Sequence, residues 1–233
     1  MTNPLNLDTV DVDGAVQELA ADAGFGRADF LKKGALAGGG ILVGSLAAGE
    51  VLGTAHAAIS TRRRSPANDV KILNFALTLE FLEAEFYKQA RDNQAYLNPL
   101  YRRFGEVVAD HEAKHVAFLR RVLGSKAVKK PKFDFKDTVT DPNRFAQTAQ
   151  VLEDTGVMAY LGQVNNIKQP VVLGSAGTIA TVEARHAAWI RFLNKEPNAS
   201  TALTDLPAPL TFDQRKSERT ILKAVQGTGF ISG

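Results

Sequence analysis

Cysteine is absent from the 233-residue chain, and its absence excludes several classes of function. Without thiolates the protein can form no disulfide, no iron–sulfur cluster, no zinc site built on cysteine and no cysteine nucleophile. The absence does not identify the compartment, because reducing and oxidising environments both tolerate a cysteine-free chain. Any metal site in this protein must therefore be built without thiolate ligands.

Strand patterns and nucleic-acid-binding patterns are also missing. No segment shows sustained alternation of apolar and polar residues, which argues against a β-sheet. The net charge of +3 is uneven, because residues 1–57 carry three basic and seven acidic residues and leave the remainder at +7. The basic residues are not interleaved with aromatic ones, so we interpret this charge as a solvated surface and expect no nucleic-acid partner.

Residues 1–57 have the pattern of an export signal. Lys32-Lys33 precede the apolar, small-residue stretch Gly34–Ala55, and Ala55-His56-Ala57 resembles a cleavage site. The stretch Arg27–Lys32 resembles a twin-arginine signal in which Ala28 replaces the second arginine. An uncleaved membrane anchor is the alternative, but Glu50 within the stretch favours cleavage. We therefore expect an exported protein, periplasmic or at the cell surface, that meets the membrane only through this signal, followed by a linker over residues 58–66.

The spacing of apolar residues predicts helices in the rest of the chain. Asn68 or Asp69 is expected to cap the first helix, and Gly124 to end the second. Turns are expected at Asn98-Pro99 and Gln169-Pro170, and Asp141-Pro142 is typical of a helix start. The predicted ranges are 69–97, 100–123, 142–167, 171–194 and 212–225. This order predicts an all-α fold: a four-helix bundle of two antiparallel hairpins over residues 67–195, with a long crossover at 125–141 and a short C-terminal helix in the 196–233 extension.

Two copies of Glu-x-x-His are the clearest functional signal. They are Glu112-Ala113-Lys114-His115 and Glu183-Ala184-Arg185-His186. A spacing of three places the carboxylate and the imidazole on one face of a helix. A bundle that holds two metal ions needs such a pair from each of two helices and one further Glu from each of the other two. A chance double match has a frequency of roughly one in a hundred for this composition.

The two further Glu residues follow from hairpin geometry. Residues equidistant from a tight turn lie at the same height in an antiparallel pair, so the partner of Glu112 is expected near position 85 and that of Glu183 near 155. Glu153 is the single Glu of its predicted helix. Near position 85 the candidates are Glu80, Glu83 and Glu85.

A repeated tyrosine spacing chooses among these three candidates. Tyr87 follows Glu80 by seven residues, and Tyr160 follows Glu153 by seven residues. Two helical turns place each Glu and its Tyr on one face, which favours Glu80 and leaves Glu83 as an extra or alternative ligand. Glu85 points elsewhere and is expected to be solvated. Tyr87 and Tyr160 are candidate catalytic residues, with ordinary core tyrosines as the alternative.

Three segments resemble the ferritin-like di-iron superfamily. Leu73–Glu80 with Tyr87 resembles the first helix of such proteins. Leu152–Tyr160 and Val182–Ala188 resemble the branch that contains plant desiccation-related proteins and many exported bacterial proteins. The resemblance covers residues 67–195 and implies a ferritin-like bundle with a dinuclear centre. It implies Glu80 and Glu153 as terminal ligands, Glu112 and Glu183 as bridging ligands, and His115 and His186 as nitrogen ligands.

The charge of the cluster favours two metal ions. Four carboxylates in an apolar core repel one another, and two divalent cations neutralise them. Oxygen and imidazole ligands without sulfur suit iron or manganese. Such a centre implies dioxygen or peroxide as the small-molecule partner, in an oxidase, a peroxidase or a stress-protection protein. The sequence does not define the oligomeric state, and a dimer is compatible with it.

Two alternatives stay open at the level of sequence. His111-Glu112-Ala113-Lys114-His115 also fits H-E-x-x-H, the zinc-protease motif in which both His bind zinc and Glu is the base. That interpretation leaves Glu80, Glu153 and the second Glu-x-x-His without a role. A metal-free structural or stress-protection bundle is the other alternative, although it does not explain why six residues have mutually consistent heights.

Overall fold

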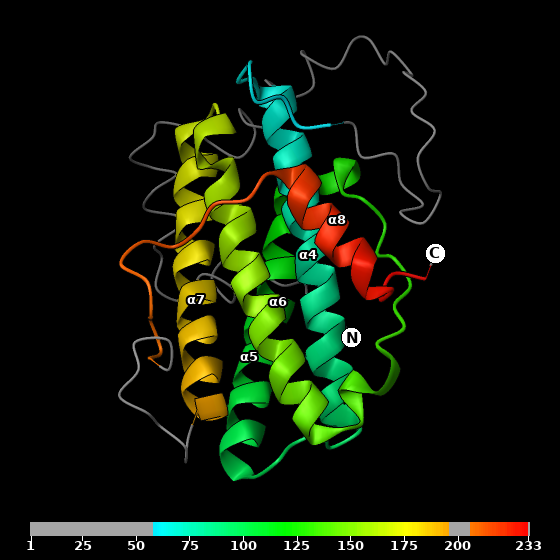
Figure 1. Ribbon diagram of the computed structural model, residues 1–233. Helices are drawn as coiled ribbons and strands as arrows, with labels where there is room; N and C mark the ends of the chain where they lie inside the picture. The colour runs from blue at the N-terminus through cyan, green and yellow to red at the C-terminus, as the bar shows by residue number, and fades with distance from the viewer. Residues whose placement is uncertain (1–57, 196–205, 233) are drawn as a thin grey trace.

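Four long helices form the body of the molecule in the computed structural model, which describes residues 58–195 and 206–232 (Figure 1). Helices α4 and α5 make one antiparallel hairpin, and α6 and α7 make the other. A short helix, α8, packs obliquely against α6. The helix bounds are Pro66–Asp92 for α4, Pro99–Leu123 for α5, Pro142–Gln163 for α6, Pro170–Lys195 for α7 and Glu218–Thr228 for α8. The predicted all-α bundle with a short C-terminal helix is confirmed.

The connection between the hairpins runs back along the bundle from the end of α5 to the start of α6 (Figure 1). It contains two 3₁₀ turns, η1 (Gly124–Lys126) and η2 (Lys136–Val139). Its middle is held by the C-terminal tail, because the backbone N–H of Asp134 donates to the carbonyl of Phe230 at 2.8 Å. The neighbouring isolated bridge, Phe133 to Ile231, is the sole β-type pairing within the described residues. The crossover and the tail therefore stabilise each other.

Side-chain caps define where the helices start. Asp141 caps α6 and is followed by proline in the first turn, as predicted. Asn98, predicted as part of a turn, caps α5 in the same way and is followed by Pro99. The predicted cap of α4 is wrong, because the hydroxyl of Ser65 accepts from the N–H of Asn68 and the helix begins at Pro66. Asp69 instead accepts from the backbone N–H groups of Lys168 and Gln169 at 2.8 and 3.0 Å. That buried carboxylate fixes the α6–α7 turn against α4.

Three helix ends lie furthest from their predicted positions. Helix α4 ends at Asp92 rather than near 97, because the chain reverses at Gln94, whose φ is 55°. Helix α6 stops at Gln163, where the 3₁₀ turn η3 (Val164–Asn166) begins. Helix α8 starts at Glu218 rather than 212, because Ser217 caps it. Gly124 ends α5 with φ 56°, as predicted.

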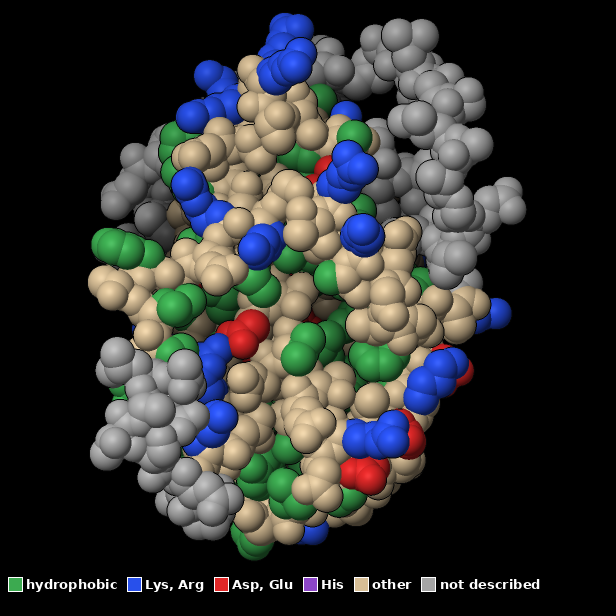
Figure 2. All heavy atoms as spheres, viewed as in Figure 1, with side chains coloured by type: hydrophobic (Ala, Val, Ile, Leu, Met, Phe, Trp, Pro, Cys, Tyr) green, Lys and Arg blue, Asp and Glu red, His purple; other side chains and the backbone are tan. Residues whose placement is uncertain are grey.

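Lys and Arg side chains gather over the upper part of the face shown in Figure 2. Among the described residues, no helix is long and apolar enough to cross a membrane. The predicted export signal, residues 1–57, lies outside the described residues and stays a prediction.

Gly162 allows the C-terminal segment to approach α6. A Cβ at this position would lie 1.8 Å from the carbonyl oxygen of Lys216, whose backbone N–H donates to the carbonyl of Met158.

We expect Gly162→Ala to destabilise the protein by about 1–3 kcal/mol, because the backbone must move to make room for the added methyl group. Gly177→Ala in α7 is the matched control, because a Cβ at this position has no heavy atom within 4 Å. We expect it to raise the free energy of unfolding by up to about 1 kcal/mol. Thermal denaturation of both variants tests this, and an unchanged melting temperature for Gly162→Ala would contradict it.

Candidate metal centre

Acidic and histidine side chains from all four long helices converge in the middle of the bundle. The four predicted carboxylate ligands are 0% exposed, although charged groups are rarely buried without a partner. His186 is 3% exposed, and the side chain of His115 is 13% exposed. Each helix contributes one or two of these residues: Glu80 and Glu83 lie on α4, Glu112 and His115 on α5, Glu153 on α6, and Glu183 and His186 on α7.

The ligand atoms fall into two groups that share two carboxylates. In each group, every residue offers one nitrogen or oxygen atom, and these atoms lie within 4.8 Å of one another. Glu112 and Glu183, the carboxylates of the two Glu-x-x-His motifs, belong to both groups. The groups are Glu80, Glu112, His115, Glu183 and Glu112, Glu153, Glu183, His186. The structure therefore brings all six sequence-predicted ligands together as two adjoining half-sites.

Each histidine presents its Nδ1 atom to the carboxylates. His115 Nδ1 lies 3.2 Å from Glu80 Oε2, 3.0 Å from Glu112 Oε2 and 3.1 Å from Glu183 Oε1. His186 Nδ1 lies 3.2 Å from oxygens of both Glu112 and Glu153. One N–H points at one oxygen, so a single proton cannot serve several carboxylates, whereas a cation between them contacts all of them.

Unsatisfied oxygens provide an independent test of whether the cluster fits a metal. Glu80 Oε2, Glu112 Oε1 and both carboxylate oxygens of Glu183 are buried and accept no aligned hydrogen bond. Buried polar atoms in folded proteins are rarely left without a partner, because each costs about 1–3 kcal/mol. All four atoms belong to residues of the two ligand groups. The residues present therefore fit a metal site.

Burial and mutual repulsion shift the pKa values of the acidic groups. Desolvation raises the pKa of Glu80 to about 7 and raises the pKa of Glu83 and Glu183 well above the usual range, the latter two with added repulsion from neighbouring carboxylates. Desolvation acts on Glu112 too, but His115 and His186 outweigh it, so the pKa of Glu112 lies below its usual value. The metal-free cluster thus retains protons on several carboxyl groups.

The two histidines keep their protons in the same setting. Burial by itself lowers the pKa of an imidazole, but Glu153 and Glu112 outweigh it and raise the pKa of His186 to about 10. Glu112 and Glu80 likewise raise the pKa of His115 well above the usual range. A metal ion must displace these protons before it can use the nitrogen atoms.

The two tyrosines are hydrogen-bonded to ligands of the opposite helix. The hydroxyl of Tyr87 on α4 donates to Glu153 on α6, and the hydroxyl of Tyr160 on α6 donates to Glu80 on α4. The sequence pairs each Tyr with the Glu of its own helix, and the structure shows that the bonds cross between helices. Burial, with the adjacent carboxylates, raises the pKa of both hydroxyls well above 10, so both remain donors.

Glu83 is buried beside the ligand groups, and a glycine makes room for it. It is 3% exposed, and a Cβ at Gly156 would lie 3.2 Å from Glu83 Oε1 and 3.3 Å from Glu183 Oε2. Sequence reasoning missed Gly156, although a glycine in a helix interior one turn after Glu153 is a signal of close packing. Glu85 belongs to neither ligand group, and its side chain, 18% exposed, pairs at the surface with Lys130 of the crossover.

His111 contacts the outer nitrogen of His186. Its Nδ1 lies 2.8 Å from His186 Nε2, and the two rings stack with their centroids 5.1 Å apart. Burial lowers the pKa of His111, with further lowering from His186, so it is a neutral acceptor for the His186 N–H. His111 belongs to neither ligand group and does not share a site with His115. The geometry gives no support to the zinc-protease interpretation.

Comparison with protein families agrees with this geometry. Residues 68–196 match the ferritin-like domain. The chain belongs to this family. A search of curated proteins gives no significant match. The match to the ferritin-like domain starts at the first turn of α4 and continues past the end of α7, so it contains both hairpins and every residue of the two ligand groups.

The metal-free ferritin-like domain should lose stability as the pH rises. Glu80 and His186 have folded pKa values of about 7 and about 10, above the ordinary values of 4.5 and 6.5, so the folded protein binds protons more tightly than the unfolded chain. Stability from these groups is complete below the unfolded pKa and is lost as the pH passes the folded pKa. Glu112 is ionised in both states above about pH 5 and adds no slope there.

We therefore expect the melting temperature of the metal-free protein to fall between about pH 5 and about pH 9. Scanning calorimetry in a chelator measures it. Glu80→Gln should reduce the slope below about pH 7, since the variant does not titrate. A melting temperature that rises over this range would contradict the raised pKa values of Glu80 and His186 in the folded protein.

Proposed function

We propose that this protein binds a dinuclear iron or manganese centre through Glu80, Glu112, His115, Glu153, Glu183 and His186. The observation that carries the proposal is the pair of adjoining ligand groups that share Glu112 and Glu183. Two divalent ions would neutralise the four fully buried carboxylates of these groups. Glu112 and Glu183 would bridge the ions, and Glu83 would be an additional or alternative ligand. The absence of sulfur ligands favours iron or manganese over softer metals.

The activity we propose is turnover of dioxygen or peroxide. A pair of redox-active ions held by these residues would supply two electrons together, as the two-electron reduction of either molecule requires. The protein's own residues would exclude water from the centre, hold the carboxylates in place and keep two tyrosine hydroxyls within reach. Tyr87 and Tyr160 orient Glu153 and Glu80 through the hydrogen bonds described above. They are also placed to carry an oxidising equivalent.

The placement within the superfamily is part of the proposal. We infer an exported protein of the desiccation-related branch, on the basis of the leader pattern in residues 1–57 and the segments Leu152–Tyr160 and Val182–Ala188. A metal-free structural bundle is the alternative. The four unsatisfied oxygens argue against it, because a metal-free core gains nothing from buried carboxylate oxygens that accept no aligned hydrogen bond.

Metal analysis of the purified protein tests the proposal directly. Protein isolated without a chelator should contain about two ions of iron or manganese per chain, as expected for a dinuclear carboxylate bundle. The double variant Glu183→Ala, His186→Ala should lose most of this metal, because it removes one bridge and one nitrogen. Glu85→Ala is the control, since Glu85 lies on α4 but points to Lys130. Full metal content in the double variant would overturn the proposal, and peptide cleavage that a zinc chelator stops would favour the protease.

His111 should tune the half-site that contains His186. Binding through Nδ1 leaves the His186 proton on Nε2, where His111 Nδ1 accepts it at 2.8 Å. We expect His111→Ala to weaken metal binding at this half-site by about 10–100-fold, as for other outer partners of histidine ligands. His111→Asn retains an acceptor and should restore part of the affinity. Competition with a chelator measures it, and equal affinities for wild type and His111→Ala would contradict this role.

A further inference from the structure

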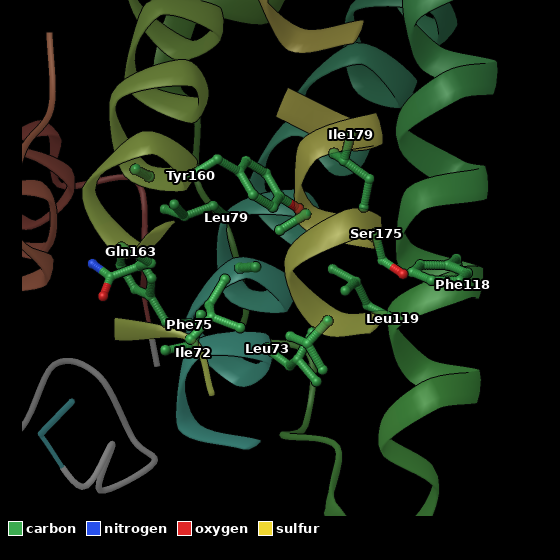
Figure 3. Close-up of a pocket in the computed structure, with 15 residues that line it drawn as sticks. Ile72, Leu73, Phe75, Leu79, Phe118, Leu119, Tyr160, Gln163, Ser175 and Ile179 are labelled. Atoms are coloured by element: carbon green, nitrogen blue, oxygen red, sulfur yellow. The ribbon is translucent and has the colours of Figure 1, made fainter. Parts of the chain in front are cut away.

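An apolar pocket lies between the four long helices (Figure 3). Each helix contributes wall residues, for example Leu79 from α4, Leu119 from α5, Ala159 from α6 and Ile179 from α7. The cavity volume is about 20 Å³, measured as the space open to the centre of a water-sized sphere. About 10–15 Å³ on this measure holds one water, so the pocket has room for a diatomic molecule.

The pocket adjoins the ligands along the bundle axis. Ala76, Phe118 and Ile179 line it, and each lies one helical turn, about 5.4 Å, from a ligand on its own helix. The corresponding ligands are Glu80, His115 and Glu183. Tyr160 connects the two spaces, because its ring forms part of the pocket wall while its hydroxyl donates to Glu80. A molecule in the pocket is therefore separated from the half-site of Glu80 and His115 by little more than one tyrosine.

The polar groups of the wall are engaged with the protein. The Tyr160 hydroxyl donates to Glu80, and the Ser175 hydroxyl donates to the carbonyl of Val171 at 2.8 Å. Gln163 Oε1 accepts from Asn166 at 2.9 Å, and Figure 3 shows the amide of Gln163 directed away from the centre of the pocket. The other lining residues have apolar side chains. The wall thus presents an apolar surface to a small solute.

We propose that this pocket holds dioxygen, and not hydrogen peroxide, beside the metal centre. The inference rests on the proposed function and chooses between its two partner molecules. Hydrogen peroxide has two O–H donors and would lose its hydrogen bonds to water on entry, at a cost of about 1–3 kcal/mol for each group left without a partner. Dioxygen has no such groups and loses little on leaving water. Dry apolar cavities in proteins bind small apolar guests such as xenon for the same reason.

Xenon binding to the metal-loaded protein tests the pocket without using turnover. Xenon is close to dioxygen in size and apolarity, and its nuclear magnetic resonance shift reports occupancy of a protein cavity. We expect one xenon site per chain. Ala159→Leu and Ala176→Leu fill the pocket from α6 and from α7, and both should abolish that site. Ala146→Leu is the matched control, because Ala146 also lies on α6, is 4% exposed compared with 2% for Ala159, and does not line the pocket.

The outcomes separate this inference from the proposed function. Metal-loaded protein that binds no xenon would overturn the pocket and leave the metal centre standing. Protein that binds no metal would overturn the proposed function. Xenon binding unchanged in both filled variants would show that the gas occupies another cavity and would also overturn the inference.

Kinetics with the two oxidants complete the test. In the filled variants we expect oxidation of the reduced, metal-loaded protein by dioxygen to slow, while its oxidation by peroxide stays at the wild-type rate. Ala146→Leu should leave both rates unchanged. Equal slowing with both oxidants in the filled variants would contradict the selectivity for dioxygen. Ala176 is partly exposed, so Ala176→Leu is the variant better able to fold if Ala159→Leu is overpacked.

Discussion

The burial of four carboxylates in the centre of a helix bundle is the constraint on which this structure depends. In an apolar core, ionised groups of like charge are expensive, and the cost falls when cations or protons compensate them. Glu112 and Glu183 belong to both ligand groups. Under the proposed function, two ions held by these groups would compensate all four acidic side chains. Metal-free, the same cluster relies on protons held by carboxyl groups and by two imidazoles.

The two ends of the centre differ in a way that bears on chemistry. At one end the ring of Tyr87 contacts the rings of Phe86, Phe104 and Phe145, with centroid distances of 5.2–6.0 Å. At the other end Tyr160 borders the apolar pocket. The two tyrosines occupy corresponding positions in α4 and α6, and their hydrogen bonds cross between these helices. A repeated structural unit therefore supports an asymmetric site.

The geometry of the hairpins could be predicted from local patterns in the sequence. Helical spacing and turn residues predict four long helices, and equal distance from a turn brings each Glu-x-x-His level with a single Glu of the neighbouring helix. The exact helix ends were harder to predict from the sequence, because a side chain three residues earlier or later can provide the cap. Ser65 caps α4 although Asn68 and Asp69 are equally good capping residues, and both of these are used instead for tertiary hydrogen bonds.

The sequence by itself determined the helical fold and the six residues that the two half-sites contain, because both depend on periodicities within a helix and on symmetry about a turn. Only the tertiary structure decided which partners meet across helices. It pairs Tyr87 with Glu153, places His111 on the outer nitrogen of His186 and opens a small apolar pocket beside Tyr160. These contacts depend on the relative rotation and separation of helices packed side by side, which no local pattern specifies.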